Sequence, residues 1–422
     1  MALINPKDVY YIDYNGDGVN GMPTFHNWGE TALVTMRDWS REDVYLIEFK
    51  RADAFSLISL ADFIPAETLS AIRDLNSNTY LCLSNSHEGF NSAVEHVYVY
   101  VCERQGIPVE KCIFLSGGHN IAQEIEEYAN AHNKPIMKAE WLISFEGTLR
   151  NYVHHMLGWN GNESYTEWGI GHAQQIGNDA QLNAKPWPIT LTPPPYKRTF
   201  LCFNRRWRPH RPALVGLLCA EDMLKDGYVS LGKGDDPRCW DTEFQHVADF
   251  LRPNVSAYRS WTQNQEAIQG MGDLYLDTPD LITNRAEFEL GPAYYYEHSL
   301  FSLVNETNFF CDHEAYEDMT FLSEKFFKPV AMQHPFLICS TPGIYRAIHE
   351  LGYQTFPEFI PEDFDSITCD ATRMWRIIEI VKDIIAWDDE KRREFVEYAT
   401  PICEHNWHTL FHKDLVCHRM NY

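Results

Sequence analysis

The most regular alternation of hydrophobic and polar segments lies in the second half of the chain. A short apolar run at 301–304 predicts a strand with a polar end. Apolar positions within 326–331 recur at helical spacing, and Ser323 precedes them as a candidate N-cap. The apolar run at 335–339 predicts a buried parallel strand. We therefore expect a strand, a loop, a helix and a second strand in this order.

Polar side chains lie where this strand should end and where the helix should begin. Asn305 and Glu306 end the strand, and Ser323, Glu324 and Lys325 begin the helix. In open α/β sheets, ligands bind beyond the carboxyl ends of strands, where helix N-termini offer free N–H groups. The Glu324 carboxylate could hold a ribose diol, and the Lys325 ammonium could neutralise a diphosphate. The alternative is an ordinary capped helix start with a solvated charge pair.

The first half of the chain repeats a strand, turn and helix order, which predicts a parallel sheet. The predicted strands cover 9–13, 43–49, 79–84, 111–116 and 135–145. The apolar run at 94–101 fits either a helix or a strand. A turn at Gly117 and Gly118 precedes a predicted helix at 121–131. Such a turn cradles phosphate in some proteins and only permits close packing in others.

A change in composition separates the two halves. Residues 158–195 are rich in Gly, Asn, Trp, Gln and Pro, which is typical of a connector with stiff, extended elements. A chain of 422 residues is long for one core and suits two domains. We therefore predict one domain over 1–195 and a second over 196–422.

A cluster of basic side chains follows the first predicted strand of the second half. That strand covers 197–204 and ends at Asn204, and the next helix should begin near Arg211. The loop and helix start carry Arg205, Arg206, Arg208, His210 and Arg211. Because the chain as a whole has a net charge of −25, this cluster implies either an anionic ligand or a loop that balances acidic neighbours.

The rest of the second half predicts two more strands and four more helices. The strands cover 228–231 and 353–356, and the helices cover 345–351, 372–386, 388–398 and 406–415. The mixed pattern between 233 and 289 does not indicate the order of its helices and strands. Long helices at the C-terminus commonly cover a sheet.

Composition narrows the class of protein. A content of 45% hydrophobic and 14% aromatic residues supports substantial cores, and the acidic balance works against nonspecific attraction to nucleic acid or anionic membrane. No apolar stretch approaches the roughly 20 residues of a membrane helix, and no basic and apolar leader begins the chain. We expect a soluble, cytoplasmic protein, in the host cytoplasm if it is viral. The sequence does not indicate its oligomeric state.

Metal ligands are weakly represented. Asp13, Asn15 and Asp17 match the first positions of a calcium loop, but Thr24 stands where that loop needs glutamate. The 11 cysteines form no Cys-x-x-Cys pair, which favours reduced, buried thiols over disulfides or zinc. We therefore expect no metal site. The polar turn at Asp17 is either structural or an acceptor-side loop.

In residues 197–365 the chain resembles the donor-binding domain of α-1,3-fucosyltransferase-like glycosyltransferases of the GT-B type, including related viral, phage-type enzymes. The resemblance rests on the order of a strand ending in Asn204, a basic helix start at Arg211, a polar strand end at Asn305 and Glu306, and the Ser323-Glu324-Lys325 triplet before a helix. The chain departs from the family in having Asn-Glu-Thr where the family shows Glu-Asn, and in its basic-rich loop.

The resemblance implies an α/β fold of the GT-B type, with two Rossmann-like domains, a cleft between them and C-terminal helices. It implies that Arg211 and Lys325 contact the diphosphate of a nucleotide sugar and that Glu324 contacts its ribose. The expected donor-binding set is Asn204, Arg205, Arg211, Asn305, Glu306, Ser323, Glu324 and Lys325. Inversion by direct displacement then requires no cofactor and no metal beyond the nucleotide-sugar substrate.

In such an enzyme the catalytic base comes from the first half. Glu88 follows the predicted strand 79–84, has His87 beside it, and is the first candidate; Asp17 is the second. The acceptor would be a hydroxymethylated base in viral DNA, or a glycan. Two alternatives remain: a noncatalytic sugar- or nucleic-acid-binding protein of the same fold, and another Rossmann-like nucleotide-sugar enzyme. An epimerase or dehydrogenase is disfavoured because no Gly-x-Gly-x-x-Gly follows the first strand.

Overall fold

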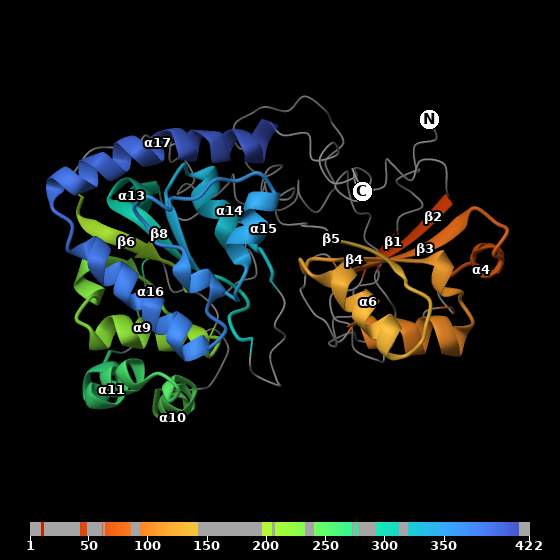
Figure 1. Cartoon of the computed structure of the whole chain (residues 1–422), viewed down its shortest axis with the longest axis horizontal. Coiled ribbons are helices and arrows are strands. Elements are labelled where there is room, and N and C mark those ends of the chain that lie inside the picture. Colours follow the sequence, from red (N-terminus) through yellow and green to blue (C-terminus); the bar gives the residue numbers. More distant parts are fainter. Residues whose placement is uncertain are drawn as a thin grey trace. The chain divides into compact units, whose positions relative to one another are not determined.

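The structure is a computed structural model of the whole chain (Figure 1). It describes residues 10–11, 43–48, 61, 64–85, 93–141, 196–204, 207–232, 240–271, 274, 276, 293–311 and 320–412. The chain divides into two compact units, residues 1–178 with 414–422 and residues 179–413. The predicted boundary at 195 stays a prediction, because it falls at the edge of a segment outside the described residues.

The first unit contains a five-stranded parallel sheet in the order β1-β2-β3-β4-β5. Its strands are β1 (Tyr10–Tyr11), β2 (Asp43–Glu48), β3 (Thr79–Asn85), β4 (Cys112–Ser116) and β5 (Lys138–Trp141). Its helical segments are α4 (Ala66–Arg73), α5 (Ala93–His96), the π-helix η3 (Val97–Glu103), the 3₁₀ turn η4 (Val109–Lys111) and α6 (Ile121–Ala131). The ambiguous run at 94–101 is thus helical.

The polar groups of the turn after β4 form hydrogen bonds within the protein. The Ser116 hydroxyl accepts the Gly118 N–H at 3.1 Å, and the Trp141 indole donates to the Gly117 carbonyl at 3.0 Å. Gly117 and Gly118 are both buried. These contacts favour close packing over a phosphate cradle.

The second unit contains a four-stranded parallel sheet in the order β7-β6-β8-β9. Its strands are β6 (Arg198–Cys202), β7 (Gly227–Val229), β8 (Ser299–Asn305) and β9 (Phe336–Cys339). β8 and β9 are buried along their whole length, as expected for parallel strands with both faces covered. The chain leaves β6 towards β7 and later returns to the other side of β6 with β8, so the strand order reverses between β6 and β8.

Helices cover both faces of this second sheet (Figure 1). α9 and α16 pack on one face, while α14 and α17 lie together on the other. The helical segments are α9 (His210–Ala220), η6 (Leu224–Asp226), α10 (Trp240–Leu251), α11 (Val255–Gln263), α12 (Gln265–Gln269), α13 (Ala293–Glu297), α14 (Glu324–Ala331), α15 (Ile344–Glu350), η9 (Asp363–Ser366), α16 (Asp370–Ile385) and α17 (Asp389–His412). The prediction of an α/β chain with parallel sheets is confirmed.

Two predictions of secondary structure are wrong. Residues 353–356 form no strand, because the Asn406 side chain takes the place of a neighbouring strand: it accepts the Gln354 N–H at 2.7 Å and donates to the Gln354 carbonyl at 2.8 Å. The helices predicted at 388–398 and 406–415 are one helix, α17, which continues through Pro401. Buried Ala399 and Cys403 on either side of this proline hold the helix against the unit, although proline removes one helical hydrogen bond.

The described helices include none that is both long and apolar enough to cross a membrane. Within the same residues, no three His, Cys, Asp or Glu side chains come together as a group that could hold a metal ion.

Candidate functional site

The carboxyl ends of β6 and β8 meet at the point where the strand order of the second sheet reverses. Asn204 follows β6 and Asn305 ends β8, and the Asn305 side-chain amide donates to the Asn204 side-chain oxygen at 2.9 Å. The two residues are 101 positions apart in sequence. In open α/β sheets such a reversal opens a crevice in which ligands bind.

Glu306 follows β8 and is fully buried. One carboxylate oxygen accepts the N–H groups of Ser323 and Phe326, both at 3.2 Å. The other accepts the Thr307 N–H at 2.9 Å and the Ser323 hydroxyl at 2.6 Å. Burial raises the pKa of Glu306, and the neighbouring Lys325 ammonium and Ser323 hydroxyl oppose this effect only in part. The carboxylate thereby joins the end of β8 to the start of α14.

The start of α14 holds the predicted Ser323-Glu324-Lys325 triplet. Ser323 is the N-cap, as predicted, and its hydroxyl accepts the Lys325 N–H at 3.3 Å. The Lys325 ammonium donates to Glu324 at 2.8 Å, to the Ser323 hydroxyl at 3.1 Å and to the Thr307 hydroxyl at 3.2 Å. Burial alone would raise the pKa of Glu324, but the charges of Lys325 and Lys328 hold it at about 2. Glu324 is therefore ionised and paired.

The start of α9 approaches the same point from the other face of the sheet. His210 and Arg211 are both buried, and both contact the Glu306 carbonyl oxygen, at 3.0 and 3.4 Å. Burial lowers the pKa of His210, and the Arg211 charge lowers it further. The neutral imidazole stacks on Phe309, with ring centroids 5.6 Å apart. The first turns of α9 and α14 are thus tied to one residue, Glu306.

The structure brings most of the predicted donor-binding residues to this one strand edge: Arg211, Ser323, Glu324 and Lys325 in the network around Glu306, and the bonded pair Asn204 and Asn305 beside it. The Lys325 side chain is 23% exposed and that of Glu324 is 10% exposed, whereas the other members are buried. Lys325 is thus the member best able to reach a ligand without rearrangement. Arg205, Glu88 and Asp17 lie outside the described residues, so their roles stay predictions.

Arg373 on α16 is an organising residue that the sequence reasoning missed. Its buried guanidinium pairs with Asp370 at 2.5 Å and donates to the carbonyl oxygens of Ser340 (3.0 Å), Ile367 (2.7 Å) and Phe309. It thereby joins the loop after β9 to the segment after β8. The available signal was an arginine on the apolar face of a predicted helix, four positions before the buried Ile377.

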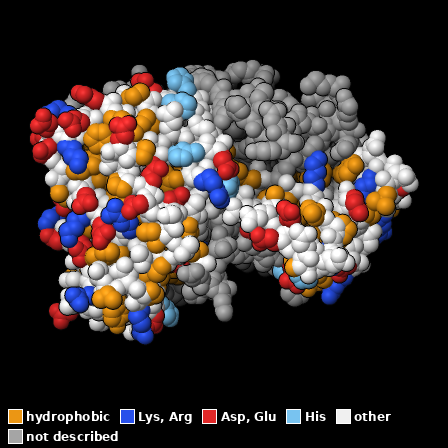
Figure 2. Space-filling view, in the orientation of Figure 1, with side chains coloured by type: hydrophobic (Ala, Val, Ile, Leu, Met, Phe, Trp, Pro, Cys, Tyr) orange, Lys and Arg blue, Asp and Glu red, His pale blue; other side chains and the backbone are white. Residues whose placement is uncertain are grey.

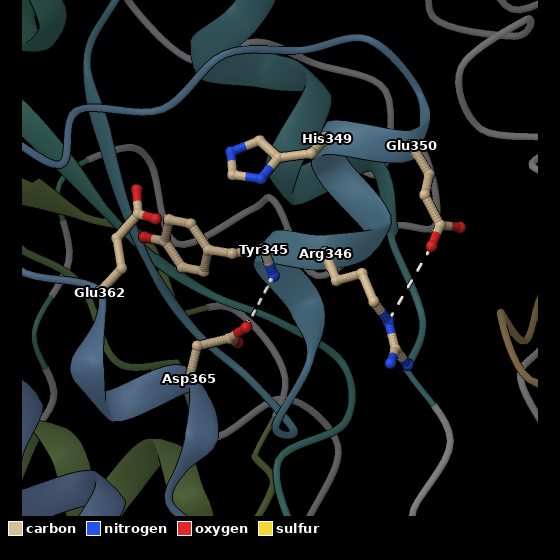
Figure 3. A pocket seen from close by; sticks show the side chains of 6 residues that line it. All are labelled: Tyr345, Arg346, His349, Glu350, Glu362 and Asp365. Atoms are coloured by element: carbon tan, nitrogen blue, oxygen red, sulfur yellow. Dashed lines mark hydrogen bonds and ion pairs between the residues drawn. The ribbon is translucent and has the colours of Figure 1, made fainter.

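A pocket lies beside α15, away from the network around Glu306 (Figure 3). The pocket has a volume of about 510 Å³ and is lined by Tyr345, Arg346, His349, Glu350, Glu362 and Asp365. Asp365 accepts the Tyr345 N–H at 3.3 Å, and burial together with the charge of Glu362 raises the pKa of Asp365 to about 6. Asp365 Oδ1 and Glu362 Oε1 are buried and have no hydrogen-bond partner among the described residues.

The surface of the second unit carries mixed charge. Figure 2 shows basic and acidic side chains interspersed over its visible face. On this face the described residues form no basic stripe of the kind that binds a nucleic-acid backbone.

Comparisons of the chain with protein-family models, with curated proteins and with solved structures found no match.

Proposed function

We propose that the chain is a glycosyltransferase of the GT-B type that transfers a sugar from a nucleoside diphosphate sugar, with the second unit as its donor-binding half. The observation that carries the proposal is the convergence of Arg211 and Lys325, from the starts of two helices, at the strand-order reversal of a parallel sheet. Diphosphate is the ligand class that two such cations at a helix-flanked strand edge suit.

In the proposed reaction an acceptor hydroxyl attacks the anomeric carbon directly and the nucleoside diphosphate leaves. Lys325 and Arg211 stabilise the developing negative charge on the leaving group, and Glu324 holds the ribose diol. The base that takes the acceptor proton is Glu88 or Asp17 of the first half. Displacement with inversion then needs no metal. The acceptor is a hydroxymethylated base in viral DNA or a glycan.

The second candidate is a noncatalytic binding protein of the same fold. It is supported by the burial of Asn204, Arg211 and Asn305, whose side chains bond within the protein. Catalysis and mere binding differ in one readout: only a transferase slowly releases nucleoside diphosphate from its own sugar nucleotide in water.

The test begins with a thermal-shift screen of nucleotide sugars, followed by an assay for release of nucleoside diphosphate. Calorimetry with the nucleoside diphosphate then compares Lys325→Ala and Arg211→Ala with the wild type. Each variant removes charge-assisted hydrogen bonds worth roughly 1.5–3 kcal/mol, so the affinity should fall about tenfold or more.

Lys382→Ala is the matched control, because Lys382 on α16 pairs with Glu221 at the end of α9, outside the network around Glu306. It should leave the affinity unchanged. Unaltered affinity in both site variants would remove the donor-site assignment. Tight binding without any release of diphosphate would favour the noncatalytic candidate.

A further inference from the structure

Three N–H groups at the start of α14 are already occupied by side chains of the protein. Glu306 accepts those of Ser323 and Phe326, and the Ser323 hydroxyl accepts that of Lys325. A phosphate at a helix N-terminus normally takes these same donors. Because these three donors are taken, an anion bound beside α14 would rely chiefly on side-chain cations.

The Lys325 ammonium is the cation at this point, and two of its three oxygen contacts are set by Glu306. Its contacts with Ser323 and Thr307 involve hydroxyls at 3.1 and 3.2 Å. Ser323 bonds to the Glu306 carboxylate through its N–H and its hydroxyl, and Thr307 bonds to it through its N–H. Moving the carboxylate would move both hydroxyls that hold the ammonium.

The main chain of Glu306 orders the second cation. Its carbonyl oxygen accepts from the Arg211 guanidinium and lies 3.0 Å from the imidazole Nε2 of His210. One fully buried residue thus sits between the two helix starts that carry the candidate diphosphate contacts.

We propose that Glu306 is a positioning residue that does not touch the donor: its buried carboxylate takes the place of an anion at the start of α14 and holds Lys325 where a diphosphate can reach it. This inference rests on the proposed function, because it assumes that a diphosphate binds at Lys325. It assigns Glu306 a role distinct from the donor contact expected from the sequence.

The test is a double-mutant cycle with inorganic pyrophosphate as the probe, measured by calorimetry on the full chain. The variants are Glu306→Gln and Lys325→Met, alone and together. The amide of Glu306→Gln keeps one acceptor oxygen but presents N–H donors towards the Thr307 N–H, so the network must shift. We expect Glu306→Gln alone to weaken binding about tenfold.

The interaction between the two changes is the decisive readout. If Glu306 acts through Lys325, Glu306→Gln weakens binding no further once Lys325→Met is present. Additive losses would overturn the proposal, because they would mean that Glu306 contacts the ligand or acts by another route. Unchanged affinity in folded Glu306→Gln would also overturn it.

Ser323→Ala provides a second route to the same answer if Glu306→Gln does not fold. It removes the hydroxyl that joins the Glu306 carboxylate, at 2.6 Å, to the Lys325 ammonium, at 3.1 Å. It should weaken pyrophosphate binding in the wild-type background and not in the Lys325→Met background; additive losses count against the proposal here too. Glu221→Gln, on a carboxylate that bonds Ser260 and Lys382, is the control.

The failure of this inference differs from failure of the proposed function. Wild-type protein that binds no pyrophosphate and releases diphosphate from no sugar nucleotide would overturn both. Wild-type protein that binds pyrophosphate equally well with and without the Glu306 carboxylate would overturn the inference alone.

Discussion

Two carboxylate-bearing regions of the second unit, the network around Glu306 and the pocket beside α15, differ in the partners that their carboxylates have. In the network, Glu306 accepts four hydrogen bonds and Glu324 pairs with Lys325. In the pocket, Asp365 and Glu362 each keep one buried oxygen without a partner among the described residues. Burial raises the pKa of both Glu306 and Asp365, the latter to about 6, whereas the cations beside Glu324 hold its pKa at about 2.

The difference shows that burial alone does not decide the state of a carboxylate. Glu324 is buried, yet two lysines keep it ionised, whereas Asp365 has a carboxylate neighbour instead of a cation. An anionic ligand therefore suits the network, which supplies cations. The pocket, with its excess of carboxylates, does not suit one.

The largest expected effect comes from removing the residue that joins the two regions. Arg373 bonds the Phe309 carbonyl on the network side and the Ser340 and Ile367 carbonyls on the pocket side. Arg373→Met removes this donor from the carbonyls of Phe309, Ser340 and Ile367 and leaves the buried Asp370 carboxylate without its cation, which should lower the free energy of unfolding by about 3–5 kcal/mol. Urea denaturation followed by circular dichroism measures it.

Arg346→Met is the control for Arg373→Met. Its side chain is 65% exposed and lies 3.9 Å from Glu350, so the change should stay within about 0.5 kcal/mol. Equal effects of the two substitutions would show that the buried guanidinium does not hold the loops together.

The second prediction compares how the contributions of Asp365 and Glu324 to stability depend on pH. Asp365 has a raised pKa, so its ionisation opposes folding: the penalty is absent below its unfolded value near 3.8 and complete above about 6. Asp365→Asn should therefore stabilise the protein by roughly 1–2 kcal/mol at pH 7 and by almost nothing at pH 4.

Glu324 has a lowered pKa, so its contribution to stability is complete above about pH 4.5 and is lost as pH falls towards 2. Glu324→Gln should destabilise by roughly 2 kcal/mol at pH 7.

Thermal and urea unfolding at pH 4, 5.5 and 7 gives both differences. The two variants should change stability in opposite directions at neutral pH. Destabilisation by Asp365→Asn at pH 7 would mean that its bond to the Tyr345 N–H outweighs the burial of its charge.

The features of these two regions that could be predicted from the sequence are those determined by residues close together in the chain. The N-cap at Ser323, the helix after it and the strands on either side were predictable, because apolar spacing and capping act within a few residues. The residues of the network could be predicted as candidate site residues for the same reason, because they lie at strand ends and helix starts.

The missed features depend on partners distant in sequence. The Asn406 side chain that replaces a strand for Gln354 lies 52 positions away, and Arg373 reaches the Phe309 carbonyl across 64 positions. The contact between the buried Glu306 carboxylate and the N–H groups at the start of α14 was likewise not predictable, because a loop separates these residues in the sequence. No local pattern encodes such pairings, since they exist only after the sheet has brought the segments together.

The smallest predicted effect comes from comparing two buried threonine hydroxyls, that of Thr320, which donates a hydrogen bond, and that of Thr341, which has no partner among the described residues. Thr341, in the loop between β9 and α15, is 1% exposed, and its hydroxyl has no partner within the described part of the chain. Thr320 is 2% exposed, but its hydroxyl donates to the Pro342 carbonyl at 3.3 Å. Because an unsatisfied buried hydroxyl carries a desolvation penalty, Thr341→Val should be neutral or stabilise by up to about 1 kcal/mol, whereas Thr320→Val should destabilise by about 1 kcal/mol. Urea unfolding of the two isosteric variants measures the difference. A loss of stability in Thr341→Val as large as that in Thr320→Val would mean that the Thr341 hydroxyl is satisfied in solution, and that the loop beside the pocket is as fully bonded as the network around Glu306.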